Sequence, residues 1–282
     1  MQVVSEPADW TSIWLKYLKT NKTIGLVPTM GALHEGHLDL VNQAKKECDI
    51  VIVSIFVNPT QFNNSEDFAN YPVTISKDLN LLERYFVDVV FLPSVNTMYP
   101  DTTSLTFDFG PLERILEGAF RPGHFNGVGI IVSKLFNHIR PHRAYFGQKD
   151  LQQVAIIRAL TKDLSFPIEL IVVPTKRDSD GLAMSSRNLR LSPRERKAAL
   201  ILPTSLTQAK NELLSGRDWL EIQSQIKFDF EESPLAKLEY FELVHTDSVT
   251  IMTHLENGSH VSICVAAYIG TIRLIDNLPI IY

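Results

Sequence analysis

The chain has 282 residues, of which 45% are hydrophobic and 21% charged, a composition typical of a soluble globular enzyme with one large or two modest domains. Its net charge of −5, with no basic stripe, argues against nucleic-acid binding, and no apolar run is long enough to span a membrane. Cys48 and Cys264 each lie beside a β-rich apolar run, so we expect reduced thiols in a cytoplasmic chain rather than a disulfide framework.

The first βα unit is the most informative stretch of the chain. Residues 23–27 form a short apolar run that predicts a buried strand ending at Pro28, and residues 38–46 keep helical spacing. The intervening turn contains Gly31, which can adopt a positive φ. A strand, a glycine turn and a helix start together allow backbone amides and the helix dipole to meet an anion.

Two histidines, His34 and His37, bracket a glycine in this turn. A single turn histidine is most often solvated or caps a helix, but two at this spacing favour a phosphate site. A zinc helix would instead place the histidines four residues apart, as in H-E-x-x-H, so zinc is disfavoured.

The rest of the first two-thirds alternates strands with helices, which predicts an α/β fold with a doubly wound, Rossmann-like parallel sheet. The expected strands are residues 49–57, 88–92, 144–146 and 168–173, and the expected helices are residues 9–19, 74–86, 128–139 and 151–164.

Polar clusters follow several of the expected strands. They are Met30 to His37, Asn58 with Gln61, Gly147 to Asp150 with Gln153, and Asp180 to Asn188. Open α/β sheets bind ligands beyond the carboxyl ends of their strands, so we expect these clusters to share one cleft. Lys149 suits a phosphate as a point charge, although a solvated lysine is the alternative, and Ser185, Ser186 and Arg187 offer two hydroxyls and a guanidinium fork.

The composition changes near Thr175, where we place a domain boundary. Residues 1–175 form the Rossmann-like domain. Residues 176–282 form a smaller α+β domain, with helices from Ser192 to about residue 230 and strands at 238–244, 260–268 and 271–275. This second domain is expected to act as a lid over the cleft.

The chain offers no covalent nucleophile. No G-x-S-x-G elbow, Walker loop or G-x-G-x-x-G turn is present, and neither cysteine has an adjacent histidine. An inventory of donors and cations fits electrostatic stabilisation of phosphoryl or adenylyl transfer.

Five strings, PTMGALHEGH, FVNPTQF, RPGHF, YFGQKDLQQ and DGLAMSSRN, occur in this order. With them the chain resembles the pantothenate synthetase (pantoate–β-alanine ligase) family of the H-x-G-H nucleotidyltransferase-like superfamily. The resemblance implies that ATP and (R)-pantoate give pantoyl adenylate and pyrophosphate, and that β-alanine then displaces AMP to give pantothenate. It also implies a homodimer and a requirement for Mg²⁺.

By this resemblance, His37 is the proton donor and acts with His34, Lys149 and Arg187 as catalytic residues, while Gln61, Gln153 and Asn58 bind pantoate and β-alanine. The implied ATP-binding residues are Met30, Gly31, Ala32, Leu33, His34, Glu35, Gly36, His37, Gly147, Gln148, Lys149, Asp150, Lys176, Met184, Ser185, Ser186 and Arg187.

Magnesium marks a departure from the family pattern. Some members hold the ion through neighbouring acidic residues in the helix after a Tyr-Pro pair, and here only Asp78 matches. We therefore expect Asp78 as the protein ligand, with ATP supplying the other contacts.

Two other classes of function stay open on the residues alone. A nucleotidyltransferase would use the same turn and release pyrophosphate but no free AMP, and it would not need Gln61 and Gln153. A nucleotide-binding regulatory module would keep the turn without turnover.

Overall fold

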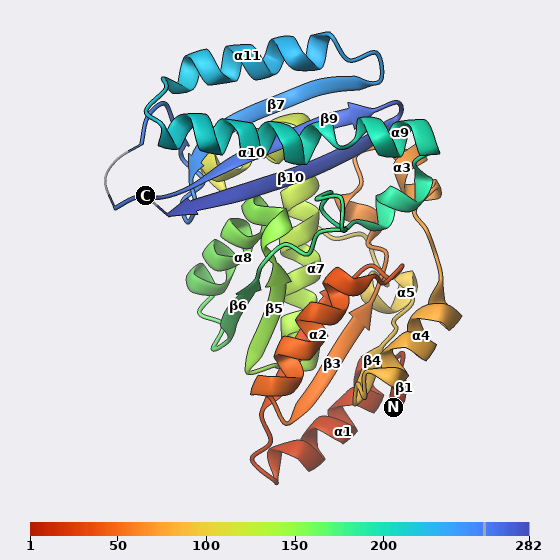
Figure 1. Cartoon of the computed structure of the whole chain (residues 1–282). Coiled ribbons are helices and arrows are strands. Elements are labelled where there is room, and N and C mark those ends of the chain that lie inside the picture. The colour runs from red at the N-terminus through yellow and green to blue at the C-terminus, as the bar shows by residue number, and fades with distance from the viewer. Residues whose placement is uncertain (256–257, 282) are drawn as a thin grey trace. The chain divides into compact units, whose positions relative to one another are not determined.

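The computed structural model describes residues 1–255 and 258–281, which divide into two compact units (Figure 1). The first unit comprises Met1–Gly147 and Ile156–Pro174, and the second comprises Gln148–Ala155 and Thr175–Tyr282. The main division falls at the composition change near Thr175. Residues 148–155 group with the second unit although they precede it in the chain. No described helix is both long and apolar enough to cross a membrane.

The first unit is built on a sheet of six parallel strands, which confirms the predicted doubly wound α/β fold. The strands lie in the order β1-β4-β3-β2-β5-β6, with bounds Gln2–Val4 (β1), Ile24–Thr29 (β2), Ile50–Ile55 (β3), Val89–Phe91 (β4), Arg143–Gly147 (β5) and Glu169–Val173 (β6). β3 is buried at all six positions and β2 at five of six, because helices cover both faces of a parallel sheet. β1 was not predicted, since three residues at a sheet edge are too few to show a period.

Helices connect these strands. They are α1 (Pro7–Leu18), α2 (Glu35–Glu47), α3 (Ser65–Ala69), α4 (Ile75–Arg84), α5 (Val95–Met98), α6 (Leu116–Phe120) and α7 (His124–Ile139), with 3-10 turns η1 (Pro59–Gln61) and η2 (Gly110–Glu113). α8 (Leu151–Asp163) begins among residues of the second unit and ends among those of the first. α7 begins at His124, four residues before the predicted Val128. The residue before it, Gly123, is the N-cap and has a left-handed backbone with φ 79°, which sets the start of the helix.

The order of the strands reverses at β2. It pairs with β3 as far as Thr29 and Ile55, but with β5 only at Gly25 and Leu26. The strand was expected to end at Pro28, yet it continues to Thr29 because pairing with β3 persists past the proline. β3 and β4 lie on one side of β2, whereas β5 and β6 lie on the other side. Ligands of open α/β sheets bind at such a switch point, between the carboxyl ends of β2 and β5.

The second unit confirms the predicted α+β domain. Its antiparallel sheet has the order β10-β9-β7-β8, and its elements are η3 (Gln148–Asp150), η4 (Ser186–Arg190), α9 (Pro193–Ala198), α10 (Ile201–Leu214), α11 (Trp219–Glu231), β7 (Ala236–His245), β8 (Ile251–Met252), β9 (His260–Ile269) and β10 (Ile272–Ile281).

α10 packs over β9 and β10, and α11 packs over β7. Their core includes Leu206, Trp219 and Phe241. The last strand was expected to end at Ile275, but β10 continues through Pro279, which an edge strand tolerates.

Candidate functional site

The turn after β2 has an unusual backbone that a buried carboxylate holds in place. Gly31 has φ 82° and Ala32 has φ 48°, so two consecutive residues occupy the left-handed region. The amides of Ala32 and Leu33 each donate to a different carboxylate oxygen of Asp78, at 2.9 Å in both cases. The Thr74 hydroxyl lies 3.1 Å from each of the same two oxygens. Because an uncommon backbone persists only where its surroundings fix it, Asp78 is the residue that stabilises this turn.

This arrangement changes the role expected of Asp78. The side chain is 1% exposed, and its oxygens already accept hydrogen bonds from two amides and a hydroxyl. A metal ion would have to displace these donors. Asp78 as a magnesium ligand therefore stays a prediction that this geometry does not favour. The amides of Ala32 and Leu33 donate to the Asp78 carboxylate rather than to a bound phosphate.

The two histidines cap the start of α2 with their rings. The backbone amide of Gly36 donates to Nδ1 of His34 at 3.2 Å, and the amide of His34 donates to Nδ1 of His37 at 3.3 Å. A ring nitrogen that accepts a hydrogen bond carries no proton, so in the neutral rings the proton sits on Nε2. The ring centroids are 4.0 Å apart. The turn thus presents two Nε2–H donors at the positive end of a helix, which suits an anionic ligand.

Gln61 is held from both ends of its amide. Its Oε1 accepts from Nδ2 of Asn58 at 3.1 Å, and its Nε2 lies 3.0 Å from the Met30 sulfur. The predicted cluster after β3 therefore meets the turn after β2 within the first unit, as expected for neighbouring strand ends. Gln153, its predicted partner for pantoate, belongs to the second unit, so the pairing of the two glutamines stays a prediction.

Asn58 is buried and uses its side-chain amide for hydrogen bonds within the protein. The side chain is 1% exposed. Its Nδ2 also donates to the carbonyl of Gly127 at 3.2 Å, while its Oδ1 accepts from the hydroxyls of Tyr99 at 2.7 Å and Thr60 at 3.0 Å. Burial raises the pKa of Tyr99, so the phenol stays protonated and remains a donor. With both donors and both acceptor positions used, Asn58 holds the amide of Gln61 in place. Its contact with pantoate or β-alanine stays a prediction that these hydrogen bonds do not favour.

His124 at the start of α7 and Arg121 just before it hold η1, and the sequence analysis gave neither residue a role. The carbonyl of Gln61 lies 2.8 Å from Nδ1 of His124 and 3.4 Å from a guanidinium nitrogen of Arg121. Gly127 lets the helix backbone approach η1 so closely that an added Cβ would lie 2.3 Å from the Thr60 carbonyl oxygen. The string RPGHF was the one available signal, since it lies in a long connection with little periodicity.

In the second unit, the predicted phosphate-binding cluster sits on a hairpin and a 3-10 turn. Arg177 pairs with Ala183 across the hairpin, and the amide of Met184 donates to the carbonyl of Lys176 at 2.9 Å. Ser185 caps η4 by accepting from the amide of Arg187 at 3.2 Å, which leaves its hydroxyl hydrogen as a donor. These contacts order the backbone that carries Ser185, Ser186 and Arg187.

The predicted ATP-binding residues thus fall into two sets. Met30 to His37 and Gly147 belong to the first unit. Gln148 to Asp150, Lys176 and Met184 to Arg187 belong to the second. An added Cβ on Gly147 would meet no atom within 4 Å, so the end of β5 has space beside it. That the two sets meet around one ATP molecule stays a prediction.

The structure gives no protein cage for a metal ion. No group of three or more histidine, cysteine, aspartate or glutamate side chains suits an ion within residues 1–255 and 258–281. A divalent ion that arrives with ATP fits this donor set best, because Mg²⁺ commonly keeps several waters and takes its remaining ligands from substrate phosphates.

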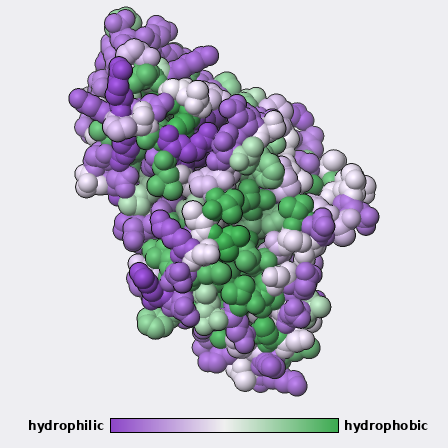
Figure 2. All heavy atoms as spheres, turned by 90° about the vertical axis from the view of Figure 1, so that its right-hand side faces the viewer, coloured by the Kyte–Doolittle hydropathy of each residue, from purple (hydrophilic) through white to green (hydrophobic). Residues whose placement is uncertain are grey.

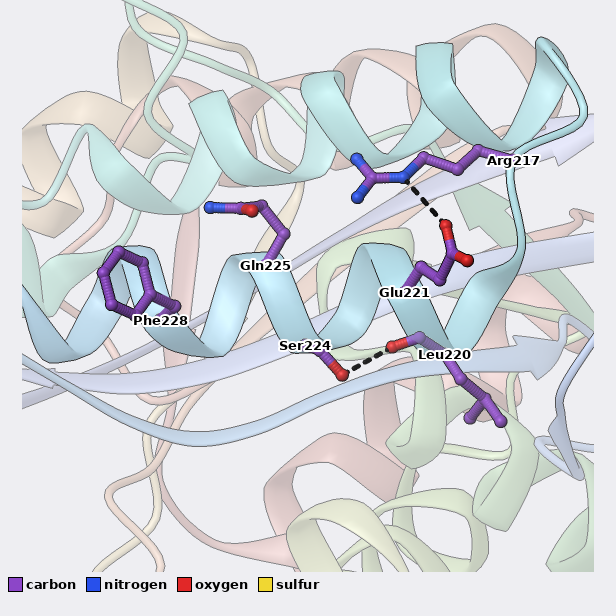
Figure 3. A pocket seen from close by; sticks show the side chains of 6 residues that line it. All are labelled: Arg217, Leu220, Glu221, Ser224, Gln225 and Phe228. Carbon is purple, nitrogen blue, oxygen red and sulfur yellow. Dashed lines mark hydrogen bonds and ion pairs between the residues drawn. The ribbon is translucent and has the colours of Figure 1, made fainter.

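A shallow hollow of about 500 Å³ lies on the outer side of α11 (Figure 3). Its walls include Leu220, Phe228 and the ion pair of Arg217 with Glu221, whose Nε and Oε2 are 3.5 Å apart. None of the predicted site residues lines it, and it offers no buried polar group for chemistry. The predicted site residues lie elsewhere, on the segments after β2 and β3 in the first unit and on η3 and the hairpin in the second.

Comparison with known proteins places these features in a family. The family model described as pantoate-beta-alanine ligase matches residues 2–279. A pantothenate synthetase of Thermoanaerobacter sp. (strain X514) is 50% identical over 279 residues, which cover 99% of this chain and 98% of that protein.

Solved structures agree. The crystal structure of pantothenate synthetase from Thermus thermophilus superposes with a TM-score of 0.91 at 39% identity and covers 99% of both chains. A pantoate-beta-alanine ligase from Francisella tularensis, complexed with beta-gamma ATP and beta-alanine, has a TM-score of 0.81 at 39% identity. Those matches cover 99% of this chain and 97% of the Francisella chain.

Proposed function

Because this chain belongs to the pantoate–β-alanine ligase family, we propose that it condenses pantoate with β-alanine at the expense of ATP. In the first step a carboxylate oxygen of pantoate attacks the α-phosphorus of ATP, the bond from that phosphorus to the bridging oxygen breaks, and pyrophosphate leaves. In the second step the amine of β-alanine attacks the acyl carbon of pantoyl adenylate and loses a proton, and AMP leaves with the electrons of the acyl–oxygen bond.

The main support for this proposal is the pair of imidazoles, His34 and His37, that cap the start of α2 at the switch point. His34 and His37 accept backbone hydrogens at Nδ1, so their Nε2–H groups serve as donors for charge that develops on the α-phosphate and on the leaving pyrophosphate. Donors already fixed by the fold need no reorganisation during the reaction. Lys149 and Arg187 would add positive charge from the second unit, and Ser185 and Ser186 would add hydroxyl donors.

We assign pantoate to Gln61 and Gln153, and β-alanine to the region of Gln61. Asn58, Tyr99 and the start of α7 fix the orientation of Gln61, as expected for a side chain that must present its amide in one direction. A buried amide left without its partner costs about 1–3 kcal/mol, so alanine at either glutamine should weaken pantoate use roughly 5- to 150-fold with little change in ATP affinity. An unchanged Michaelis constant for pantoate in both variants would assign these glutamines to the scaffold.

The metal of the reaction is proposed to be Mg²⁺ that is bound with the phosphates of ATP. When bound, the ion would neutralise phosphate charge. The described residues supply no cage for it, so the protein groups around it would be few.

The decisive experiment is product analysis with ATP, pantoate and β-alanine, combined with exchange of labelled pyrophosphate into ATP. The proposal expects AMP, pyrophosphate and pantothenate, and exchange with pantoate alone. Pyrophosphate without AMP would indicate a nucleotidyltransferase, and nucleotide binding without any turnover would indicate a regulatory module. Exchange that needs β-alanine would overturn the order of the steps.

We also propose a cytoplasmic homodimer. Figure 2 shows a face of the first unit, on the side of β1, β4 and α5, where apolar side chains gather. Val3 of β1 and Val95 of α5 are exposed by 48% and 46%, and β1 is one of the two edge strands of the sheet. An apolar face beside an open strand edge suits a protein interface. Val95→Glu should leave a monomer in light scattering, whereas Leu220→Glu on α11 should not.

The lid role expected for residues 176–282 is proposed here as well, since closure would shield pantoyl adenylate from water. Hydrogen exchange between residues 175 and 192 should slow when ATP and pantoate bind. Identical exchange with and without the ligands would count against closure.

A further inference from the structure

Two consecutive residues of β10, Asp276 and Asn277, contact both of the phosphate-site segments that lie in the second unit. They follow the segment around Lys149 by more than 120 residues and the hairpin by about 100. The side chains of Asp276 and Asn277 are 3% and 2% exposed. The proposed reaction uses neither residue directly, so their placement needs a separate explanation.

Asn277 holds the turn that carries Lys149. Its Nδ2 donates to the carbonyl of Gln148 at 2.9 Å and to the carbonyl of Lys149 at 2.8 Å. A primary amide is the neutral side-chain group that offers two hydrogens from one nitrogen, so it can join the carbonyls of two successive residues. The backbone of η3 is therefore fixed from β10, and with it the starting point of the Lys149 side chain.

Asp276 holds the hairpin through Arg177. The two guanidinium nitrogens of Arg177 reach the two carboxylate oxygens of Asp276 at 2.6 Å and 2.9 Å, a bidentate pair. Arg177 also donates to the carbonyl of Gly181 at 3.0 Å and to that of Asn277 at 3.0 Å. Burial raises the pKa of Asp276, while the Arg177 guanidinium and the charge of Lys149 oppose that rise.

The hairpin leads directly into the predicted phosphate contacts. Arg177 lies on one strand of the hairpin and Gly181 at its turn, and the amide of Met184 closes onto the carbonyl of Lys176. Ser185 follows at once and caps η4. A shift of Arg177 would therefore be passed along the backbone to Ser185, Ser186 and Arg187.

We propose that Asp276 and Asn277 are positioning residues for the adenylation step. Together they set the spacing between the Lys149 turn and the Ser185–Arg187 segment, so that both meet the phosphates of one ATP molecule. This inference rests on the proposed function, because it assigns the geometry to pyrophosphate release. Neither side chain contacts substrate in this scheme; each acts through the backbone that it holds.

The test compares Asn277→Ala and Arg177→Lys with the wild type. Asn277→Ala removes both donors to η3, and Arg177→Lys keeps the charge but loses the fork. The matched control is Glu239→Gln, which weakens an ion pair between Arg273 of β10 and Glu239 of β7, on the same strand but away from η3 and the hairpin. Pyrophosphate exchange, turnover of supplied pantoyl adenylate with β-alanine and thermal unfolding are measured for each protein.

A misplacement of about 1 Å can cost about 100-fold in rate. We therefore expect exchange by Asn277→Ala and Arg177→Lys to fall about 10- to 100-fold per folded molecule. Turnover of pantoyl adenylate should fall less than about 3-fold, because pyrophosphate has already left in that half-reaction. Glu239→Gln should keep wild-type exchange even if its unfolding temperature drops.

The inference fails if both site variants keep wild-type exchange, or if their two half-reactions fall equally. It also fails if Glu239→Gln loses exchange to the same degree, since the effect would then follow general loosening of the sheet. Should Asn277→Ala not fold, Arg177→Lys decides alone. A wild-type protein that shows no exchange at all would overturn the proposed function instead, so the two failures are distinct.

Discussion

Replacing Gly127 by alanine tests whether α7 positions the pantoate side of the site. The added Cβ would lie 2.3 Å from the Thr60 carbonyl oxygen, whereas ordinary contacts of a Cβ begin at 3.4 Å. The helix and η1 must therefore separate by about 1 Å, and both neighbours are backbone that cannot rotate away. Gln61 is the last residue of η1, so it must move with Thr60 or lose its contacts with Asn58.

The magnitude follows from this displacement. A shift of about 1 Å at a positioned group can cost about 100-fold, so kcat/KM for pantoate should fall between about 10- and 100-fold. Overpacking costs about 1–3 kcal/mol of stability, offset by up to about 1 kcal/mol because alanine is the better helix former. Most of the protein should therefore stay folded, and steady-state kinetics with varied pantoate can be measured directly.

Gly129→Ala on the same helix is the control. There an added Cβ would lie 2.9 Å and 3.0 Å from ring atoms of Phe107 and Phe109, which are side chains that can yield. The variant should keep its activity towards pantoate within about 3-fold, although it gains the same methyl group. A folded Gly127→Ala protein with the wild-type kcat/KM for pantoate would contradict a positioning role for α7, and so would equal losses of activity in both variants.

The other predictions test the supports of Gln61 and of the turn after β2. Tyr99→Phe removes the 2.7 Å hydrogen bond to Asn58, and at about 1 kcal/mol it should lower kcat/KM for pantoate about 5-fold without changing the Michaelis constant for ATP. Equal losses for both substrates would contradict that assignment. Asp78→Asn replaces an acceptor opposite Ala32 or Leu33 with a donor, so unfolding in urea should show a loss of about 1–3 kcal/mol together with reduced pyrophosphate exchange. If excess Mg²⁺ restores exchange in that variant, Asp78 is a metal ligand after all.

Local sequence signals predicted the sheet and the segments that follow its strands. Buried parallel strands read as continuous apolar runs, and β3 is buried at all six positions. The turn containing Gly31 was predicted because it follows such a run and precedes a helical period. β1 was not predicted, because its pairing with β4 defines the strand and its own three residues show no pattern.

The supports of the site could not be predicted, because they depend on contacts distant in the chain. Asp78 lies 46 residues from Ala32, and Asn277 lies 128 from Lys149. One sequence shows the type of such residues but not their partners. The hydrogen bond of Asn58 with Tyr99 could not be predicted for the same reason, since an asparagine after a strand looks alike whether it faces a ligand or a tyrosine. The positive φ of Ala32 could not be predicted either, because alanine rarely adopts a positive φ unless a contact such as the hydrogen bond to Asp78 holds its backbone.

Two variants of His34 separate its role as a helix cap from its role as a hydrogen-bond donor to the phosphates. Asparagine at position 34 can accept the Gly36 amide as an N-cap, but it lacks the Nε2–H that the imidazole presents. Alanine lacks both. We expect His34→Asn to keep wild-type stability and His34→Ala to lose about 1 kcal/mol in urea unfolding. Both should lose pyrophosphate exchange by about 100- to 1,000-fold, the usual effect of removing one preorganised donor. Turnover of supplied pantoyl adenylate should fall less in both, because its leaving group is already AMP. If His34→Asn keeps wild-type exchange, His34 is a helix cap and the donor role falls to His37 alone.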